Sequence, residues 1–245
     1  MTLSPKNENA SNPEKSNLEN SYLERAETKA KIFMLDNLDS FTYNLVDEFQ
    51  CLGYEPTIYR NTISADYILE QIETCTSPVL LVLSPGPGEP SKAGCLMELI
   101  KKTAGKYPIL GICLGHQALI EYYGGVIGRA PEIIHGKASN VQHNEVGAFK
   151  DIQQPLPVAR YHSLVATKMP DGLTMTAQFT TDDGVTLPMA IEHKIDQVIG
   201  FQFHPESILT TYGSKLLAQA IECLTNEPLT SECLAKQTVQ GNRHE

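Results

Sequence analysis

Two short motifs hold side chains that could together perform nucleophilic catalysis. The first, at residues 111–115, reads Gly-Ile-Cys-Leu-Gly and lies between an apolar run and a helical pattern. A strand, a sharp turn and a helix in that order form the elbow that presents a nucleophile between two glycines, because the backbones pack too closely for a Cβ. A cysteine at the first turn of a helix also gains from the helix dipole, which favours the thiolate. Cys113 is therefore a candidate nucleophile; the competing interpretation is a buried structural cysteine beside two turn glycines.

The second motif is Phe203-His204-Pro205-Glu206, which also follows an apolar run. A cysteine nucleophile needs a base that takes its proton and later protonates the leaving group, and the base needs an acceptor that orients it. We expect His204 to be the base and Glu206 to orient it, because Pro205 stiffens the connection between them. The competing interpretation is a loop histidine with a solvated glutamate.

A third motif, Ser-Pro-Gly-Pro-Gly-Glu-Pro at residues 84–90, is too interrupted for regular structure. Its glycines allow a backbone N–H, which we place at Gly86, to face an oxyanion, and the N–H of Leu114 would be the second donor. A phosphate loop is excluded because no Gly-Lys-Ser/Thr follows and prolines interrupt the donors. The alternative is an irregular crossover without a catalytic role.

The elements around these motifs indicate an α/β fold. Apolar strand patterns alternate with amphipathic helices in the first half of the chain, which is typical of an open, mostly parallel sheet flanked by helices. Sites in such sheets lie at the carboxyl ends of the strands, where Cys113 and the 84–90 loop both fall. The expected strands are 31–35, 56–60, 79–83 and 107–112, and the expected helices are 41–52 (capped by Asp39 or Ser40), one from Ser64, 93–103 and 118–123.

The pattern changes after Gly124-Gly125, where strands follow one another without a long helix between them. We expect an additional antiparallel or mixed strand region here, closed by an amphipathic helix at 213–224. The expected strands of this half are 126–129, 137–142, 158–161, 173–179, 189–193 and 198–203.

Composition narrows the class of protein. The 245 residues carry a net charge of −10 without clusters of Lys and Arg, which argues against nucleic-acid binding. No apolar run reaches membrane-spanning length, and no signal sequence opens the chain, so we expect a cytoplasmic protein. Six cysteines without a Cys-x-x-Cys pair indicate free thiols and no metal site. We expect a disordered extension at 1–30, one domain at 31–228 and a flexible tail at 229–245.

Together the three motifs, GICLGHQ, LSPGPGEP and FQFHPES, resemble those of the class I (triad) glutamine amidotransferases. The likeness spans residues 31 to about 224 and implies a flavodoxin-like fold. It is closest to the glutaminase components of anthranilate synthases, with those of 4-amino-4-deoxychorismate synthases next. The stretches that suggest this are 36–44, 135–137, 160–164 and 205–210.

The resemblance assigns roles to residues. It implies a catalytic triad of Cys113, His204 and Glu206 that hydrolyses L-glutamine through a thioester and releases ammonia. The residues that it implies for glutamine binding are Gly86, Pro87, Gly88, Gln117, Ser163 and Leu164.

The resemblance also implies a partner. Ammonia would pass to anthranilate synthase component I, which converts chorismate to anthranilate and pyruvate, in a heterotetramer with two copies of each subunit. No cofactor is expected on this chain, and Mg²⁺ is expected on the partner alone. We expect residues 36–44 and 135–137 to help form the contact. The alternatives are the aminodeoxychorismate branch, a stand-alone Cys-His γ-glutamyl hydrolase, and a binding or regulatory subunit without catalysis.

Overall fold

The computed structural model describes residues 29–130 and 137–225. The expected N-terminal extension and C-terminal tail lie outside these ranges, apart from Lys29 and Ala30. Ala30 is buried, and the Lys29 ammonium lies 3.9 Å from the centre of the Tyr54 ring. These two residues pack against the domain, and the disorder of the remaining terminal segments stays a prediction.

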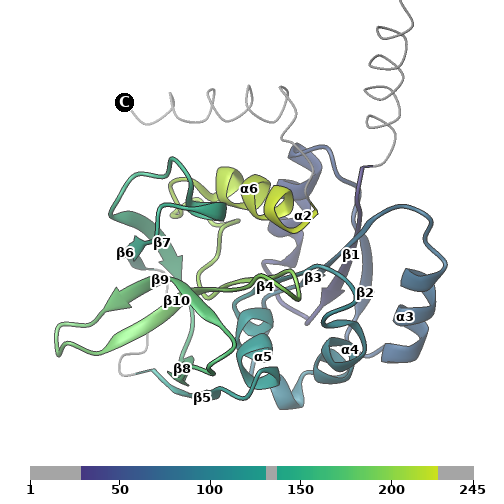
Figure 1. Cartoon of the computed structure of the whole chain (residues 1–245), viewed down its shortest axis with the longest axis horizontal. Helices are drawn as coiled ribbons and strands as arrows, with labels where there is room; N and C mark the ends of the chain where they lie inside the picture. Colours follow the sequence, from purple (N-terminus) through teal and green to yellow (C-terminus); the bar gives the residue numbers. More distant parts are fainter. Residues whose placement is uncertain (1–28, 131–136, 226–245) are drawn as a thin grey trace, which may run out of the picture.

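A nine-stranded sheet forms the centre of the molecule (Figure 1). The five neighbouring strands at one side of the sheet, from β2 to β11 in its spatial order, are parallel. Its order is β2-β1-β3-β4-β11-β10-β9-β6-β7. Among the described residues β11 is the last strand in sequence, and because it pairs with β4 the chain returns to the middle of the sheet after β10. The parallel strands are β1 (Lys31–Asp36), β2 (Thr57–Arg60), β3 (Val79–Leu83), β4 (Ile109–Ile112) and β11 (Val198–Phe201).

The other four strands extend the sheet with antiparallel pairings, as expected from the lack of helices in this region. A separate two-stranded ribbon pairs β5 with β8, which the sequence patterns did not predict. The remaining strands are β5 (Val126–Arg129), β6 (Lys137–His143), β7 (Leu156–Arg160), β8 (Leu164–Lys168), β9 (Thr174–Thr180) and β10 (Thr186–His193).

Helices cover both faces of the parallel half (Figure 1). The α2 and α6 side chains pack with one face in a cluster that includes Leu45, Val82 and Leu217. The α3, α4 and α5 side chains pack with the other face, where Leu81, Leu99 and other apolar residues form a second cluster. The helices are α2 (Thr42–Cys51), α3 (Ala65–Glu73), α4 (Leu96–Thr103), α5 (Leu114–Tyr122) and α6 (Gly213–Thr225), with 3₁₀ turns η1 (Pro90–Lys92) and η2 (Gly147–Phe149).

Three expected helix starts need correction. The helix expected at 118–123 begins at Leu114, directly after Cys113. Phe41 is the N-cap of α2, and its side chain makes no capping hydrogen bond; the Asp39 carboxylate instead accepts a hydrogen bond from the Phe41 N–H at 2.7 Å. The helix expected from residue 93 begins at Leu96, because Pro90 first imposes the short η1 turn. In the described part of the chain, no helix is both long and apolar enough to cross a membrane.

Candidate active site

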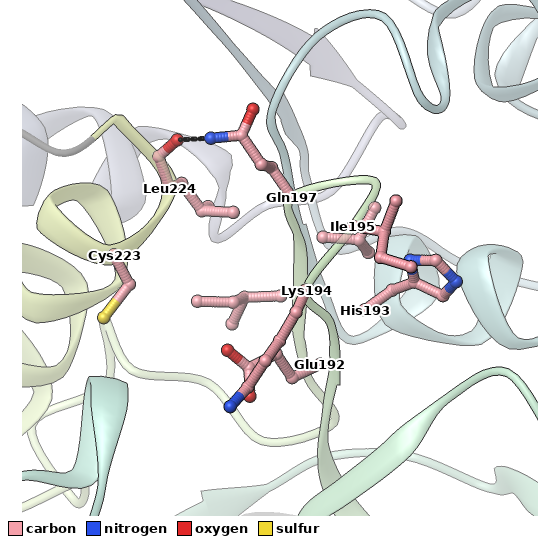
Figure 2. Close-up of a pocket in the computed structure, with 9 residues that line it drawn as sticks. Glu192, His193, Lys194, Ile195, Gln197, Cys223 and Leu224 are labelled. Carbon is pink, nitrogen blue, oxygen red and sulfur yellow. Dashed lines mark hydrogen bonds between the residues drawn. The ribbon is translucent and has the colours of Figure 1, made fainter.

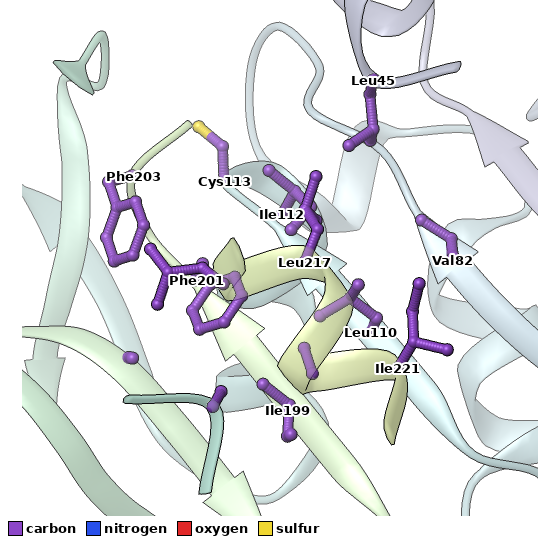
Figure 3. Packing of buried hydrophobic residues seen from close by; sticks show 14 of the residues in the cluster. Leu45, Val82, Leu110, Ile112, Cys113, Ile199, Phe201, Phe203, Leu217 and Ile221 are labelled. Carbon is purple, nitrogen blue, oxygen red and sulfur yellow. The ribbon is translucent and has the colours of Figure 1, made fainter. Parts of the chain in front are cut away.

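Cys113 lies at the junction of β4 and α5 in a strained conformation. Its φ of 51° and ψ of −98° are rare for a residue with a side chain, as expected at a nucleophile elbow. The N–H of Cys113 donates to the Phe201 carbonyl at 2.8 Å, which holds the elbow beside β11. Figure 3 shows Cys113 at the end of the apolar cluster, with its sulfur directed away from the core side chains.

The flanking glycines are required by close packing. A Cβ on Gly111 would lie 2.6 Å from Leu119 Cδ1, and one on Gly115 would lie 2.4 Å from the Leu83 carbonyl oxygen. Both distances are too short for any other residue, because α5 packs directly on the sheet here. The steric reason proposed for the motif is confirmed.

His204 and Glu206 form a buried pair. His204 Nδ1 is 2.6 Å from Glu206 Oε1, and the side chains are only 3% and 0% exposed. The second imidazole nitrogen is left for the Cys113 thiol, with which His204 also hydrogen bonds. The three predicted catalytic side chains are therefore in contact, in the order that a Cys-His-Glu triad requires.

The electrostatics of His204 favour an ion pair with Cys113. Burial opposes the charge on the imidazole and is the largest single influence on it. The hydrogen bonds to the Cys113 thiol and the Glu206 carboxylate together outweigh burial, and the pKa of His204 rises well above 6.5. The raised pKa favours the imidazolium, the form that can donate a proton to a leaving amine.

The loop at residues 84–90, which is rich in proline and glycine, lies beside the elbow. A Cβ on Gly86 would be 2.7 Å from Leu114 Cδ2 and 2.6 Å from Asn37 Cβ, so the two predicted oxyanion residues touch. Buried Asn37 anchors the start of the loop by hydrogen bonds of 2.9 Å to the hydroxyl and the carbonyl of Ser84. Leu114 is the first residue of α5, where backbone N–H groups have no acceptor within the helix.

The predicted glutamine-binding residues fall into two groups. Gln117 is buried and donates to the Leu164 carbonyl at 2.9 Å, so these two lie together. Ser163 is exposed beside Leu164, and its carbonyl accepts a hydrogen bond from the Ala130 N–H. Pro87 and Gly88 are exposed on the loop that contains half-buried Gly86. Glutamine contacts themselves remain predictions for all six residues.

Comparison with known proteins agrees with this geometry. The family model described as "Glutamine amidotransferase class-I" matches residues 33–223. The chain belongs to the class I glutamine amidotransferases. It is 54% identical to anthranilate synthase component 2 of Vibrio parahaemolyticus over 79% of this chain and 95% of that protein. It is 49% identical to the Haemophilus influenzae protein of the same name, over 80% of this chain and 99% of that protein.

Solved structures support the fold of this amidotransferase. A glutamine amidotransferase from Thermotoga maritima superposes with a TM-score of 0.54 at 16% identity, over 87% of this chain and 94% of that one. A candidate GMP synthase subunit from Thermoplasma acidophilum gives a TM-score of 0.66 at 24% identity, over 86% and 97%. At these identities the likeness concerns the fold alone.

Sequence reasoning missed three side chains at the site of this amidotransferase. Gln202 is fully buried, and its Nε2 lies 3.8 Å from Cys113 Sγ. The rings of Phe41 and Tyr161 meet the His204 ring edge-on, with centroids 5.9 and 5.2 Å away. The available signal for Gln202 was its place between Phe201 and Phe203 in an extended segment, where side chains alternate between the two faces. Phe201 and Phe203 pack in one cluster, so Gln202 faces the opposite side, where it meets Gln117 of α5.

A hollow lies at the end of β11 that is remote from Cys113 (Figure 2). Its volume is about 510 Å³, and Glu192, His193, Lys194 and Cys223 are among its lining residues. Partial burial of the thiol and then the nearby carboxylates of Glu192 and Glu222 raise the pKa of Cys223, which disfavours its thiolate. Within residues 29–130 and 137–225, no group of three or more His, Cys, Asp or Glu side chains is placed to hold a metal ion.

Proposed function

We propose that this chain is the glutamine-hydrolysing subunit of an anthranilate synthase. The observation that carries the proposal is the buried contact of Cys113, His204 and Glu206 on a class I amidotransferase fold. Proteins named anthranilate synthase component 2 match over most of the chain at 44–54% identity. This agreement favours the anthranilate branch over the aminodeoxychorismate branch and over a stand-alone hydrolase.

In the first half of the reaction, the Cys113 thiolate attacks the γ-carboxamide carbon of glutamine. The negative charge then moves to the carbonyl oxygen, where the N–H groups of Leu114 and of the Gly86 loop stabilise it. His204 gives its proton to the amide nitrogen, the C–N bond breaks, and ammonia leaves a γ-glutamyl thioester on Cys113.

In the second half, neutral His204 takes a proton from water, which attacks the thioester carbon. The C–S bond breaks, glutamate leaves, and the thiolate and the imidazolium are restored. Glu206 stabilises the imidazolium and fixes its orientation throughout, because its Oε1 remains hydrogen bonded to Nδ1. No step uses a metal or a cofactor on this chain.

Ammonia would then pass to a component I subunit that holds chorismate and Mg²⁺. In this proposal two copies of each subunit form a cytoplasmic heterotetramer. The surface near the site suits a protein partner, because Leu38, Tyr43 and Ile208 are 51%, 70% and 86% exposed. Phe41 and Ser207, which are near neighbours of these side chains in sequence, both contact Tyr161 and thus lie on one side of the site.

Replacement of the nucleophile tests the proposed function. Purified complex with Cys113→Ser should lose the glutamine-dependent formation of anthranilate, since serine at this position is a far weaker nucleophile. Formation of anthranilate from ammonium and chorismate should continue at the unmodified rate. Fluorescence of anthranilate measures both rates, and an active glutamine-dependent reaction in the variant would remove Cys113 from the mechanism.

The role of the exposed apolar side chains Leu38, Tyr43 and Ile208 in partner binding can be tested separately. Ile208→Ala and Tyr43→Ala should each weaken binding of component I about five- to tenfold, as central apolar anchors do. Ile195→Ala is the matched control, because Ile195 is 90% exposed and lies in the β10–β11 turn at the other end of β11. Titration by calorimetry measures the affinities, and equal values for Ile208→Ala and Ile195→Ala would place the interface elsewhere. Residues 135–137 were the other stretch expected to contact the partner. Because residues 135–136 lie outside the described residues, that contact stays a prediction.

A further inference from the structure

A chain of three hydrogen bonds connects a backbone carbonyl of β8 to the sulfur of Cys113. Gln117 Nε2 donates to the Leu164 carbonyl at 2.9 Å and to Gln202 Oε1 at 3.1 Å. Gln202 Nε2 in turn lies 3.8 Å from Cys113 Sγ, within hydrogen-bond distance for sulfur. Gln202 is 0% exposed and Gln117 is 3% exposed, so water does not compete for these groups.

The backbone carbonyl determines the direction of the whole chain. A carbonyl oxygen can only accept, so the Gln117 atom that faces Leu164 must be the amide nitrogen. The second hydrogen of that nitrogen faces Gln202, so the Gln202 atom there must be the oxygen. The other end of the Gln202 carboxamide, which faces Cys113, is then the nitrogen, and it offers an N–H to the sulfur.

An N–H donor at this position distinguishes between the two forms of the thiol. A thiolate accepts a strong, charge-assisted hydrogen bond, whereas a neutral thiol is a weak acceptor. Because both amide ends of Gln202 are engaged, the donor is held in place before substrate arrives. Its backbone is also fixed, since the Gln202 N–H donates to the Met189 carbonyl at 2.9 Å.

We propose that Gln202 is a fourth polar residue of the catalytic site, which stabilises the Cys113 thiolate, and that Gln117 positions it. The proposal rests on the proposed function only in taking Cys113 as the nucleophile. It also gives Gln117 a role in addition to the predicted glutamine contact: Gln117 aligns Gln202 so that a donor rather than an acceptor faces the sulfur.

Other ionisable groups around the sulfur do not supply this effect. His204, with Glu206 behind it, is the charged partner of Cys113. Burial lowers the pKa of His116 to about 3 and that of His162 to about 4, so both imidazoles are neutral at neutral pH. The Gln202 donor therefore adds to the effect of His204 on the thiolate and does not replace it.

The test is the pH dependence of Cys113 alkylation in the isolated full chain. Iodoacetamide reacts with the thiolate, and mass spectrometry of the Cys113 peptide follows the rate, with the exposed Cys51 peptide as internal reference. In Gln202→Met, which keeps the volume but has no donor, the midpoint of the profile should rise by about 0.5 to 1 pH unit. Gln202→Glu, which keeps an acceptor for Gln117, should shift the midpoint in the same direction.

A matched control separates this effect from loss of packing. Gln219 is also buried and donates to a backbone carbonyl, that of Lys150, at 2.9 Å. Gln219→Met should leave the midpoint unchanged. Gln117→Met should raise it by less than Gln202→Met, and the double variant should match Gln202→Met alone, because both act through one hydrogen-bond chain.

Two results would overturn the proposal. One is an unchanged alkylation midpoint in both folded Gln202 variants, and the other is an equal shift in Gln219→Met. Should Gln202→Met not fold, Gln202→Glu decides. The measurement uses neither chorismate nor a partner protein, so it gives its answer even if the anthranilate synthase assignment fails.

Discussion

At the scale of single residues, the elbow depends on the absence of side chains as much as on the cysteine. The conformation of Cys113 is tolerable only because α5 approaches the sheet closely enough to bury the strained turn. Gly111 and Gly115 make that approach possible, since a Cβ on either would overlap its neighbours. The same five residues, 111–115, thus determine both the strained conformation of the nucleophile and the close packing of α5 on the sheet.

Gly115→Ala should lower the free energy of unfolding by about 2 to 3 kcal/mol, because its Cβ would lie 2.4 Å from the Leu83 carbonyl. Urea denaturation followed by circular dichroism measures the loss. Gly172→Ala is the control: its Cβ would be 3.7 Å from the nearest atom, in His193, and should change stability by less than about 0.5 kcal/mol. Equal stability of the two variants would contradict the steric explanation.

The sequence was sufficient to predict the contacts among Cys113, His204 and Glu206, because each lies in a motif whose residue types are needed for the chemistry. It was not sufficient for Gln202. A glutamine between two phenylalanines is typical of a strand with one solvated face, and here α5 covers that face. The direction of the Gln202 amide depends on Gln117 and Leu164, which are distant in sequence and meet only in the fold.

At the scale of elements, the Thr210 hydroxyl links the turn that contains His204 to β7. Thr210 Oγ1 donates to the His204 carbonyl at 2.6 Å and accepts from the Ala159 N–H at 3.1 Å. The His204 N–H also donates to the Ala159 carbonyl, at 3.1 Å. The base is therefore fixed to the end of β7, an antiparallel strand at the edge of the sheet.

Thr210→Val should reduce the glutamine-dependent rate about tenfold or more, because a small displacement of the base is costly. It should also lower stability by about 1 to 2 kcal/mol, since the buried Ala159 N–H loses its acceptor. Thr103→Val removes a comparable buried hydroxyl, which donates to Leu99 in α4, and should spare the rate. Steady-state kinetics with glutamine compares the two; equal rates would mean that the hydroxyl does not position His204.

Most of the elements, but not all, could be predicted from periodicity. The apolar run of β3 and the repeats of α2 and α6 have strong patterns, and their bounds were predicted to within one residue. β8 (Leu164–Lys168) was missed because only Val165 and Ala166 are buried, so its residues show neither a continuous apolar run nor alternation. The α2 cap failed as a prediction because the Asp36 and Asp39 carboxylates bind the turn before the helix.

At the scale of the whole molecule, buried imidazoles link stability to pH. His116 and His162 have folded pKa values of about 3 and about 4, mainly because burial opposes their charge. The unfolded chain binds protons at these groups near pH 6.5, whereas the folded chain does not. Stability is therefore lost as pH falls below about 6.5. His204 acts in the opposite direction, since its folded pKa is raised.

Between pH 7 and pH 5.5, His116 alone should cost about 1 kcal/mol of unfolding free energy. His116→Leu removes this contribution, so the variant should lose about 1 kcal/mol less than the unmodified chain over the same interval. Urea denaturation at both pH values gives the loss of unfolding free energy for each protein. Any effect of the substitution that does not depend on pH cancels in this comparison. Identical pH dependence would show that His116 is not buried as a neutral group.

The position of β11 has a consequence for synthesis of the protein on the ribosome. Cys113 and its elbow are translated long before β11, which enters the centre of the sheet between β4 and β10. Until residues 198–206 have emerged, the nascent chain has the Cys113 thiol but not the His204 imidazole, and the sheet lacks its middle strand. The catalytic triad therefore stays incomplete until β11 and the His204 turn that follows it have been made.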